Sequence, residues 1–207
     1  MGKVLAQPQF SPSKPGEPVW ELLQHYPLQG QWTEDEFLAL DENRLIEFTD
    51  GMLEFLPMPT TLHQKILMML VRLLDAHLHG TDALILPAPL HLKVGPGKFR
   101  DPDLLCVLNE KDKRVGEKFW AGADLVMEVV SPGKASRERD YDEKPPLYAK
   151  VGVSEYWIVD PVQRRITVKA LRGKKYVDHS VASNGQVAAS ALLPGFTLAT
   201  DRVFGLA

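Results

Sequence analysis

Three acidic residues lie where apolar side chains would be expected, and two of them could support phosphodiester hydrolysis. Asp103 opens an apolar run after Asp101-Pro102, Glu128 interrupts the apolar run 125–130, and Glu47 lies between Ile46 and Phe48. A carboxylate in such a run loses its hydration, so it must find a cation, a hydrogen-bond donor or a proton. Two converging carboxylates can hold Mg²⁺, which stabilises charge on a phosphate and makes a bound water more acidic. A nearby lysine could orient or deprotonate that water, or neutralise the phosphate directly.

Two of these acids also have a purely structural interpretation. Asp103 could hold Arg100 or cap a turn, and Glu47 could be either an auxiliary metal ligand or the partner of Arg44. Both alternatives remain open from the sequence.

One long helix is predicted over residues 61–79. Apolar residues recur there at helical spacing, Thr61 and Gln64 form a capping box, and Gly80 stands where a glycine commonly ends a helix. His63 is mainly a residue of the helix start, although it could contact a substrate. A shorter helix is predicted from the capping box of Thr33 and Glu36 to about residue 40.

Short strands are predicted before and after the long helix. An Asp50-Gly51 turn between 44–48 and 52–55 is typical of a tight hairpin. Further strands are expected at 83–86, 89–94, 103–108, 124–130, 155–160, 166–171 and 176–181. A polar helix is expected from 137 to about 150, with a kink or break at Pro145-Pro146 and helix resuming at 147–150. The central order is thus helix, three strands, helix, strand.

Bulk composition indicates a cytoplasmic globular protein. The chain has 44% hydrophobic and 25% charged residues, and a net charge of −3 gives no general attraction for nucleic acid. We expect no signal peptide, no membrane span and a buried structural thiol at Cys106. One basic segment is either a phosphate-facing edge or a solvated hairpin, and its cations are Arg164, Arg165, Lys169, Arg172, Lys174 and Lys175.

Several segments together resemble the Uma-two family, a bacterial family assigned to the PD-(D/E)XK nuclease superfamily. The likeness covers roughly residues 30–205 and rests on motifs that are each weak but distinctive together. The matching segments are Asp101-Pro102-Asp103, Glu128 to Pro132, Asp140…Lys144…Tyr148, Gly152 to Pro161, Glu47…Asp50-Gly51, His63, and Leu193-Pro194-Gly195-Phe196.

The resemblance implies an α/β fold with a restriction-endonuclease-like core, a mixed sheet, an N-terminal hairpin and C-terminal β additions. We expect residues 31–207 to form this domain, after a proline-rich arm at 1–30. It implies that Asp103 and Glu128 bind Mg²⁺ or Mn²⁺, with the backbone carbonyl of Val129 as a third ligand. Val130 departs from the pattern, because it occupies the motif's lysine position, and Lys144 is the residue that would replace it.

Lys144 and its neighbours have alternative roles. Lys144 could be an ordinary solvated helix lysine, or it could form a salt bridge with Glu128 that involves no metal. Asp140 is expected to orient Lys144 or cap the helix rather than to bind metal.

Two main functions follow from these residues. The first is a metal-dependent endonuclease that hydrolyses DNA as a homodimer, with the basic residues Arg164, Arg165, Arg172, Lys174 and Lys175 guiding the backbone. The second is a weak or inactive nuclease-fold module that binds nucleic acid or a protein partner, suggested by Val130 and the pI of about 6.1. A hydrolase of a smaller phosphate ester is a third possibility.

Overall fold

The computed structural model describes residues 26–40 and 45–205. The larger sheet has the strand order β11-β10-β9-β8-β6-β3. Of the two acids expected to meet, Glu128 lies in β8 and Asp103 immediately precedes β6. Strands β8 and β9 run parallel, whereas the other neighbouring pairs are antiparallel. The sheet is therefore mixed, as predicted. Its strands are β3 (Leu84–Pro87), β6 (Leu104–Val107), β8 (Leu125–Val129), β9 (Glu155–Asp160), β10 (Arg165–Arg172) and β11 (Lys175–Ser183).

A second, five-stranded sheet contains the predicted hairpin. Its order is β2-β1-β5-β4-β7, formed by β1 (Ile46–Thr49), β2 (Met52–Phe55), β4 (His91–Gly95), β5 (Lys98–Arg100) and β7 (Phe119–Trp120). The predicted strand 89–94 thus leaves the main sheet and pairs in this one. A two-stranded sheet of β12 (Val187–Ala189) and β13 (Thr197–Ala199), followed by α6 (Thr200–Phe204), completes the C-terminal additions.

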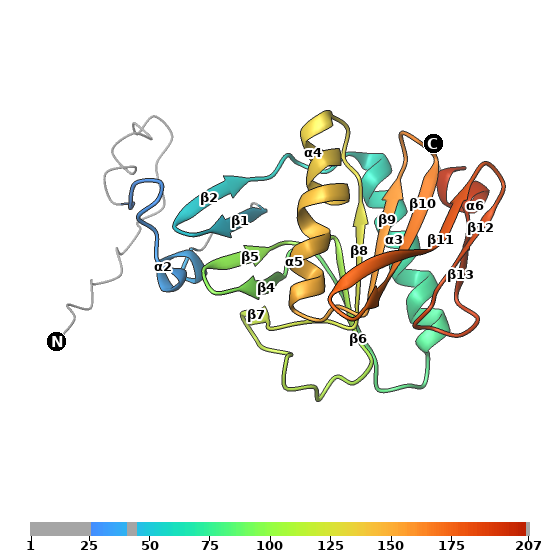
Figure 1. Ribbon diagram of the computed structural model, residues 1–207, viewed down its shortest axis with the longest axis horizontal. Coiled ribbons are helices and arrows are strands. Elements are labelled where there is room, and N and C mark those ends of the chain that lie inside the picture. Colours follow the sequence, from blue (N-terminus) through green and yellow to red (C-terminus); the bar gives the residue numbers. More distant parts are fainter. Residues whose placement is uncertain (1–25, 41–44, 206–207) are drawn as a thin grey trace.

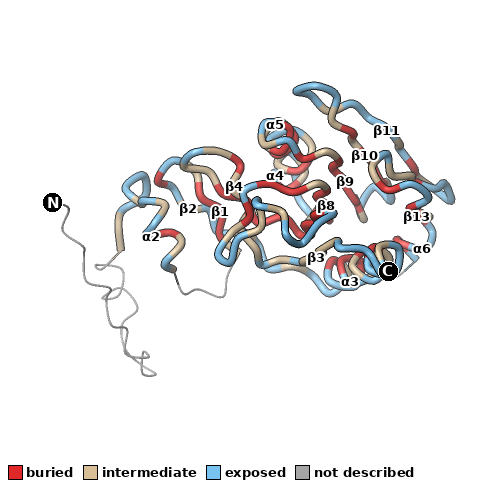
Figure 2. Tube along the Cα trace, turned by 90° about the horizontal axis from the view of Figure 1, so that it is seen from below, coloured by how far each residue is buried: buried red, intermediate tan, exposed pale blue. Residues whose placement is uncertain are grey.

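Helices cover both faces of the six-stranded sheet (Figures 1 and 2). Helix α3 (Thr61–Leu78) packs on one face, where Ile66 and Leu70 join alternate strand residues such as Met127 in one core. The helical segment before β9 packs on the other face, where Tyr148 joins Val126. Successive side chains of a strand face opposite sides of the sheet, and both sides are covered here. Strand β8 therefore contributes to both cores and is buried at every position. The acid in β8 therefore has to be accommodated inside a packed layer.

The helix starts follow the predicted capping chemistry with one correction. Helix α2 (Glu34–Leu38) begins with the predicted capping box of Thr33 and Glu36. Helix α3 is capped by Thr60, whose side chain accepts from the His63 amide at 3.2 Å, so the prediction of Thr61 as the cap is wrong by one residue. A neighbouring threonine meets the same chemical requirement, and the sequence does not distinguish the two.

The predicted second helix has three parts rather than one helix broken at the prolines. Helix α4 (Lys134–Glu138) leads into a π-helical turn, η1 (Arg139–Glu143), and then into α5 (Lys144–Lys150). Pro145 and Pro146 lie in the first turn of α5, where a missing amide is tolerated. The prediction that regular helix resumes only at 147 is therefore wrong. The wider turn absorbs the irregularity upstream of the prolines, and such turns are frequent at functional sites.

The remaining predictions concern the ends of the chain and Cys106. Most of the predicted arm, residues 1–25, lies outside the described residues, as does Arg44. Cys106 is fully buried, and burial raises the pKa of its thiol to about 12, as expected for a structural residue. Within residues 26–40 and 45–205, none of the helices combines the length and apolar character needed to cross a membrane.

Candidate active site

Asp103 and Glu128 meet because their strands are adjacent and antiparallel. Leu104 pairs with Met127 across β6 and β8, which places Asp103 opposite Glu128 at the end of β6. Asp103 Oδ2 accepts from the Val129 amide at 2.7 Å and contacts His63 Nε2 at 3.1 Å. Asp103 is therefore held by the backbone of the strand that carries the other acid.

Lys144 reaches Glu128 from the helical layer above the sheet. Its Nζ donates to Glu128 Oε1 at 2.8 Å and lies 3.0 Å from Asp140 Oδ1. The Tyr148 hydroxyl donates to the same Glu128 oxygen at 2.7 Å. Asp140, Lys144 and Tyr148 are four residues apart in sequence, so one face of the helical segment presents all three to the sheet. The sequence spacing thus becomes a single buried cluster.

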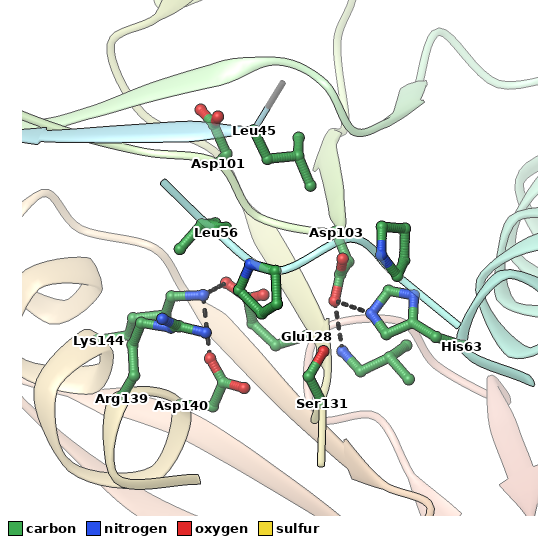
Figure 3. Close-up of a pocket in the computed structure, with 13 residues that line it drawn as sticks. Leu45, Leu56, His63, Asp101, Asp103, Glu128, Ser131, Arg139, Asp140 and Lys144 are labelled. Carbon is green, nitrogen blue, oxygen red and sulfur yellow. Dashed lines mark hydrogen bonds and ion pairs between the residues drawn. The ribbon is translucent and has the colours of Figure 1, made fainter. Parts of the chain in front are cut away.

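A pocket opens at this edge of the sheet (Figure 3). It brings together half of the predicted site residues, namely the metal-binding candidates, Lys144, His63 and Asp140. Its lining residues are Leu45, Leu56, Pro57, Pro59, His63, Asp101, Asp103, Glu128, Val129, Ser131, Arg139, Asp140 and Lys144. We call it the Asp103 pocket.

Electrostatics in the Asp103 pocket favour a charged lysine. Burial raises the pKa of Glu128, while Lys144 opposes that rise. Burial would lower the pKa of Lys144, but Glu128, Asp140 and Glu47 together raise it above its usual value. Because the pKa values of Glu128 and Lys144 are both raised, the two groups compete for one proton. We assign the proton to Lys144, because three carboxylates surround it and stabilise its ammonium form.

The structural alternatives can be compared with these contacts. Arg100 pairs with Glu47 at 3.4 Å instead of holding Asp103. Lys144 is 3% exposed, so the interpretation as a solvated helix lysine is wrong. The Glu128–Lys144 salt bridge of the metal-free interpretation is present. Because this salt bridge belongs to the same cluster that would hold a metal, it is compatible both with Glu128 as a metal ligand and with Glu128 as a structural partner of Lys144.

Glu47 lies behind Lys144 rather than in the lining of the pocket. Its Oε1 is 3.8 Å from Lys144 Nζ, and it accepts from the Asp101 amide at 3.4 Å. Burial raises the pKa of Glu47, against the lowering effect of Lys144, Arg100 and Arg139. These contacts favour a structural partner of Arg100 and Lys144 over an auxiliary metal ligand.

His63 faces Asp103 from the first turn of α3. Burial lowers the pKa of His63, but the hydrogen bond and charge of Asp103, the backbone of Val129 and the charge of Asp140 together raise it by more, so the pKa lies above its usual value. His63 Nδ1 is buried and, in the described part of the chain, has no hydrogen-bond partner. The imidazole therefore acts mainly through Asp103.

Exchanging His63 for glutamine should cost more stability in acid than in base. Because the pKa of His63 is raised in the folded protein, its contribution is fully present below the unfolded value of 6.5 and disappears as pH rises through the folded pKa. We expect a loss on the order of 1 kcal/mol at pH 5.5 and a smaller loss at pH 9, measured by urea unfolding. An equal loss at both pH values would contradict the His63–Asp103 coupling.

The predicted nucleic-acid-binding residues do not form one surface. Arg164 and Arg165 lie at the end of β10 that pairs with Asp160, on the same edge of the sheet as the Asp103 pocket. Strand β10 carries the others to its far end, roughly 20–25 Å away at about 3.3 Å per residue. These are Arg172, Lys174 and Lys175 at the β10–β11 turn.

Three polar residues of the pocket were not identified as site candidates from the sequence. Arg139 precedes Asp140 on the π-helical turn, and Ser131 follows β8. Asp101 accepts from His91 Nδ1 at 2.5 Å and from the Ile46 amide at 3.2 Å. Asp101 and Ser131 both lie in segments that match the family, Asp101 two residues before Asp103 and Ser131 three residues after Glu128. Arg139 had no such signal, because its position depends on how the segment after β8 folds back.

The donor chemistry of the Asp103 pocket fits a divalent cation. Mg²⁺ usually takes one or two carboxylates and keeps several waters. Within the described part of the chain, Asp103 Oδ1 and Glu128 Oε2 make no hydrogen bond or ion pair, while their partner oxygens are engaged. The described residues contain no ready-made cluster of three or more histidine, cysteine or acidic ligands. Two carboxylates with waters are therefore the arrangement that the residues can support.

Comparisons with known proteins identify the family and the fold. The model of the Uma2 family, described as "Putative restriction endonuclease", matches residues 34–201. No curated protein is significantly similar in sequence. The fold is similar to that in the crystal structure of "a putative nuclease belonging to DUF820 from Anabaena variabilis ATCC 29413", with a TM-score of 0.68 and 18% identity over 86% of this chain and 98% of that one. The predicted nuclease-type α/β fold is thus confirmed, and because the family model spans most of its length, the chain belongs to the Uma2 family.

Proposed function

We propose that this protein is an endonuclease that hydrolyses DNA phosphodiester bonds at the Asp103 pocket with Mg²⁺ or Mn²⁺. The observation that carries the proposal is the convergence of Asp103, Glu128 and a charged Lys144 in one pocket at the sheet edge. Family membership supports a nuclease, and the buried acids in its pocket support a divalent cofactor.

In this proposal Asp103 and Glu128 would hold the metal through the carboxylate oxygens that make no hydrogen bond or ion pair within the described residues. The Val129 carbonyl is the third candidate ligand, because the N–H and C=O of a strand residue point to the same side and the Val129 amide points to Asp103. The metal would supply Lewis-acid stabilisation of the phosphate and a more acidic water. His63 keeps Asp103 in place.

Lys144 is assigned an electrostatic role rather than that of a base. Its pKa is raised, so at neutral pH the ammonium carries its proton and donates. A protonated lysine can orient a water or neutralise charge on the phosphate, but it cannot remove a proton. Asp140 and Glu47 hold Lys144 in position against Glu128.

The edge of the sheet around the pocket offers cations for a nucleic-acid backbone. Arg164 and Arg165 lie there at the start of β10, and Arg137 of α4 pairs with Asp160 of β9 on the same edge. Neutralising backbone phosphates with such residues gives binding that weakens as salt rises. We therefore place the DNA path along this edge rather than at the β10–β11 turn.

The proposal is tested by nicking of a supercoiled plasmid in Mg²⁺ or Mn²⁺. Wild-type protein should convert the plasmid to open circles, EDTA should stop the reaction, and Asp103→Ala and Glu128→Ala should each abolish it. Nicking that survives both substitutions would exclude this pocket as the active site. Absence of cleavage by the wild type, with retained DNA or partner binding, is the result expected of a non-catalytic module.

A further inference from the structure

Arg139 is a cation of the Asp103 pocket, and part of its guanidinium group makes no hydrogen bond with the described residues. It begins the π-helical turn and lies beside Lys144 on the same side of the pocket (Figure 3). Its side chain is 13% exposed, and its Nη1 contacts Glu54 Oε1 at 3.2 Å. Its Nε is buried and, across the described residues, finds no hydrogen-bond acceptor. The guanidinium group therefore has N–H donors that no acceptor among the described residues occupies.

Lys144 is more fully engaged by protein carboxylates than Arg139 is. Three carboxylates surround the Lys144 ammonium, with Glu128 at 2.8 Å, Asp140 at 3.0 Å and Glu47 at 3.8 Å. The donors of Arg139, in contrast, form a planar fork that matches two oxygens of one phosphate. The lining also contains four acids, Asp101, Asp103, Glu128 and Asp140. An anionic substrate entering this pocket needs a cation that is not surrounded by carboxylates, and Arg139, whose ion pair is with the exposed Glu54, can supply it.

Glu54 is a weak holder of the guanidinium group. Its side chain is 64% exposed, and such ion pairs contribute little because water and salt screen them. Glu54 also lies directly opposite Glu47 across β1 and β2, and like charges in that position repel. Immediately after β2, Leu56 and Pro57 line the pocket. The Arg139–Glu54 contact thus connects the hairpin to the helical layer beside the pocket.

We propose that Arg139 binds a phosphate of the substrate strand, and that Glu54 occupies its guanidinium group in the free protein and is displaced when the phosphate binds. The inference rests on the proposed nuclease function, since it assumes a nucleic-acid substrate. It adds a binding residue and a competing internal carboxylate to that function. Arg139 binds substrate here and is separate from the metal-holding pair.

The test is binding of a fluorescein-labelled DNA duplex, followed by fluorescence anisotropy in EDTA. Without metal there is no cleavage, and the protein's own cations carry the contact. Arg139→Gln should weaken binding about tenfold and reduce the slope of log K against log salt by about 1. Arg139→Lys keeps the positive charge but loses the planar pair of donors, so its DNA affinity should lie between those of the wild type and Arg139→Gln. Arg72→Gln, which removes an exposed arginine of α3, should bind like the wild type.

Binding by Glu54→Gln is the second measurement. The substitution removes the charge of a largely exposed side chain and keeps its shape. It should tighten DNA binding several-fold, because the guanidinium group is released. The gain should vanish in the double variant with Arg139→Gln. Glu143→Gln, an exposed acid on the same helical segment, controls for the general loss of negative charge and should give a smaller gain that persists without Arg139.

The outcomes separate this inference from the proposed function. Wild-type binding and plasmid nicking with unchanged affinity in Arg139→Gln and Arg139→Lys would overturn the inference and leave the nuclease proposal standing. A Glu54→Gln gain that persists without Arg139 would overturn the displacement. No DNA binding by the wild type or any variant would overturn both.

Discussion

Lys144→Met is expected to lower the free energy of unfolding by about 3–5 kcal/mol at pH 7 and to abolish plasmid nicking. Methionine fills a similar volume but removes the charge that faces Glu128, Asp140 and Glu47, of which Glu128 is 3% exposed. Removing one partner of a buried ion pair leaves the other charge without compensation. Chemical denaturation and nicking assays measure the two effects.

The stability loss of Lys144→Met should shrink in acid. Without the lysine, burial raises the pKa of Glu128 further above its unfolded value, so the folded variant binds more protons than the unfolded chain between those two values. Stability of the variant therefore recovers as pH falls towards the unfolded pKa of 4.5. Lys150→Met, an exposed position at the end of α5, should stay within about 0.5 kcal/mol of the wild type at each pH. A Lys144→Met protein as stable as this control would contradict the buried cluster.

Asp103→Asn is expected to reduce the nicking rate by about 10³-fold with little change in stability. A bound metal contributes several kcal/mol to the transition state, and each 1.36 kcal/mol is a factor of ten in rate. The amide oxygen of asparagine can still accept from the Val129 amide, which Asp103 Oδ2 does at 2.7 Å, so the local fold should remain. Nicking rates and thermal unfolding of the same preparations separate chemistry from folding.

Asp124→Asn is the matched control for Asp103→Asn. Asp124 also precedes a core strand and accepts from a backbone amide, that of Leu108 at 2.7 Å, but it lies at the other end of β8 and outside the pocket lining. It should retain wild-type nicking. Equal losses in Asp103→Asn and Asp124→Asn would mean that Asp103 acts through the fold rather than at the reacting phosphate.

The order and the type of most elements could be predicted because they depend on local chemistry. Hairpin β1–β2 follows from the Asp50-Gly51 turn, and both residues have the positive φ that this turn requires. Strand β8 follows from its apolar run. Strands β5 and β7 were missed because three and two residues carry too little periodicity. The assignment of β4 to a second sheet depends on long-range pairing, which the local pattern of residues 89–94 does not contain.

The candidate site divides in the same way. Asp103 and Glu128 were conspicuous because a carboxylate beside apolar neighbours needs a partner, and the structure places each against identified donors. The position of Lys144 depends on the π-helical turn before it. The sequence did not predict this turn, because Pro145 and Pro146 indicated an irregularity further along the chain. Arg139 could not be predicted as a site residue, because arginine is common on a polar helix. Only the folded arrangement places it in the pocket lining.

Asp103 and Glu128 are expected to share one divalent metal ion beside Lys144. Anomalous diffraction from crystals soaked in Mn²⁺ measures this. We expect one peak at about 2.1 Å from an oxygen of each carboxylate, with Lys144 still beside Glu128. Absence of a peak at millimolar Mn²⁺, or a peak that touches neither Asp103 nor Glu128, would contradict it.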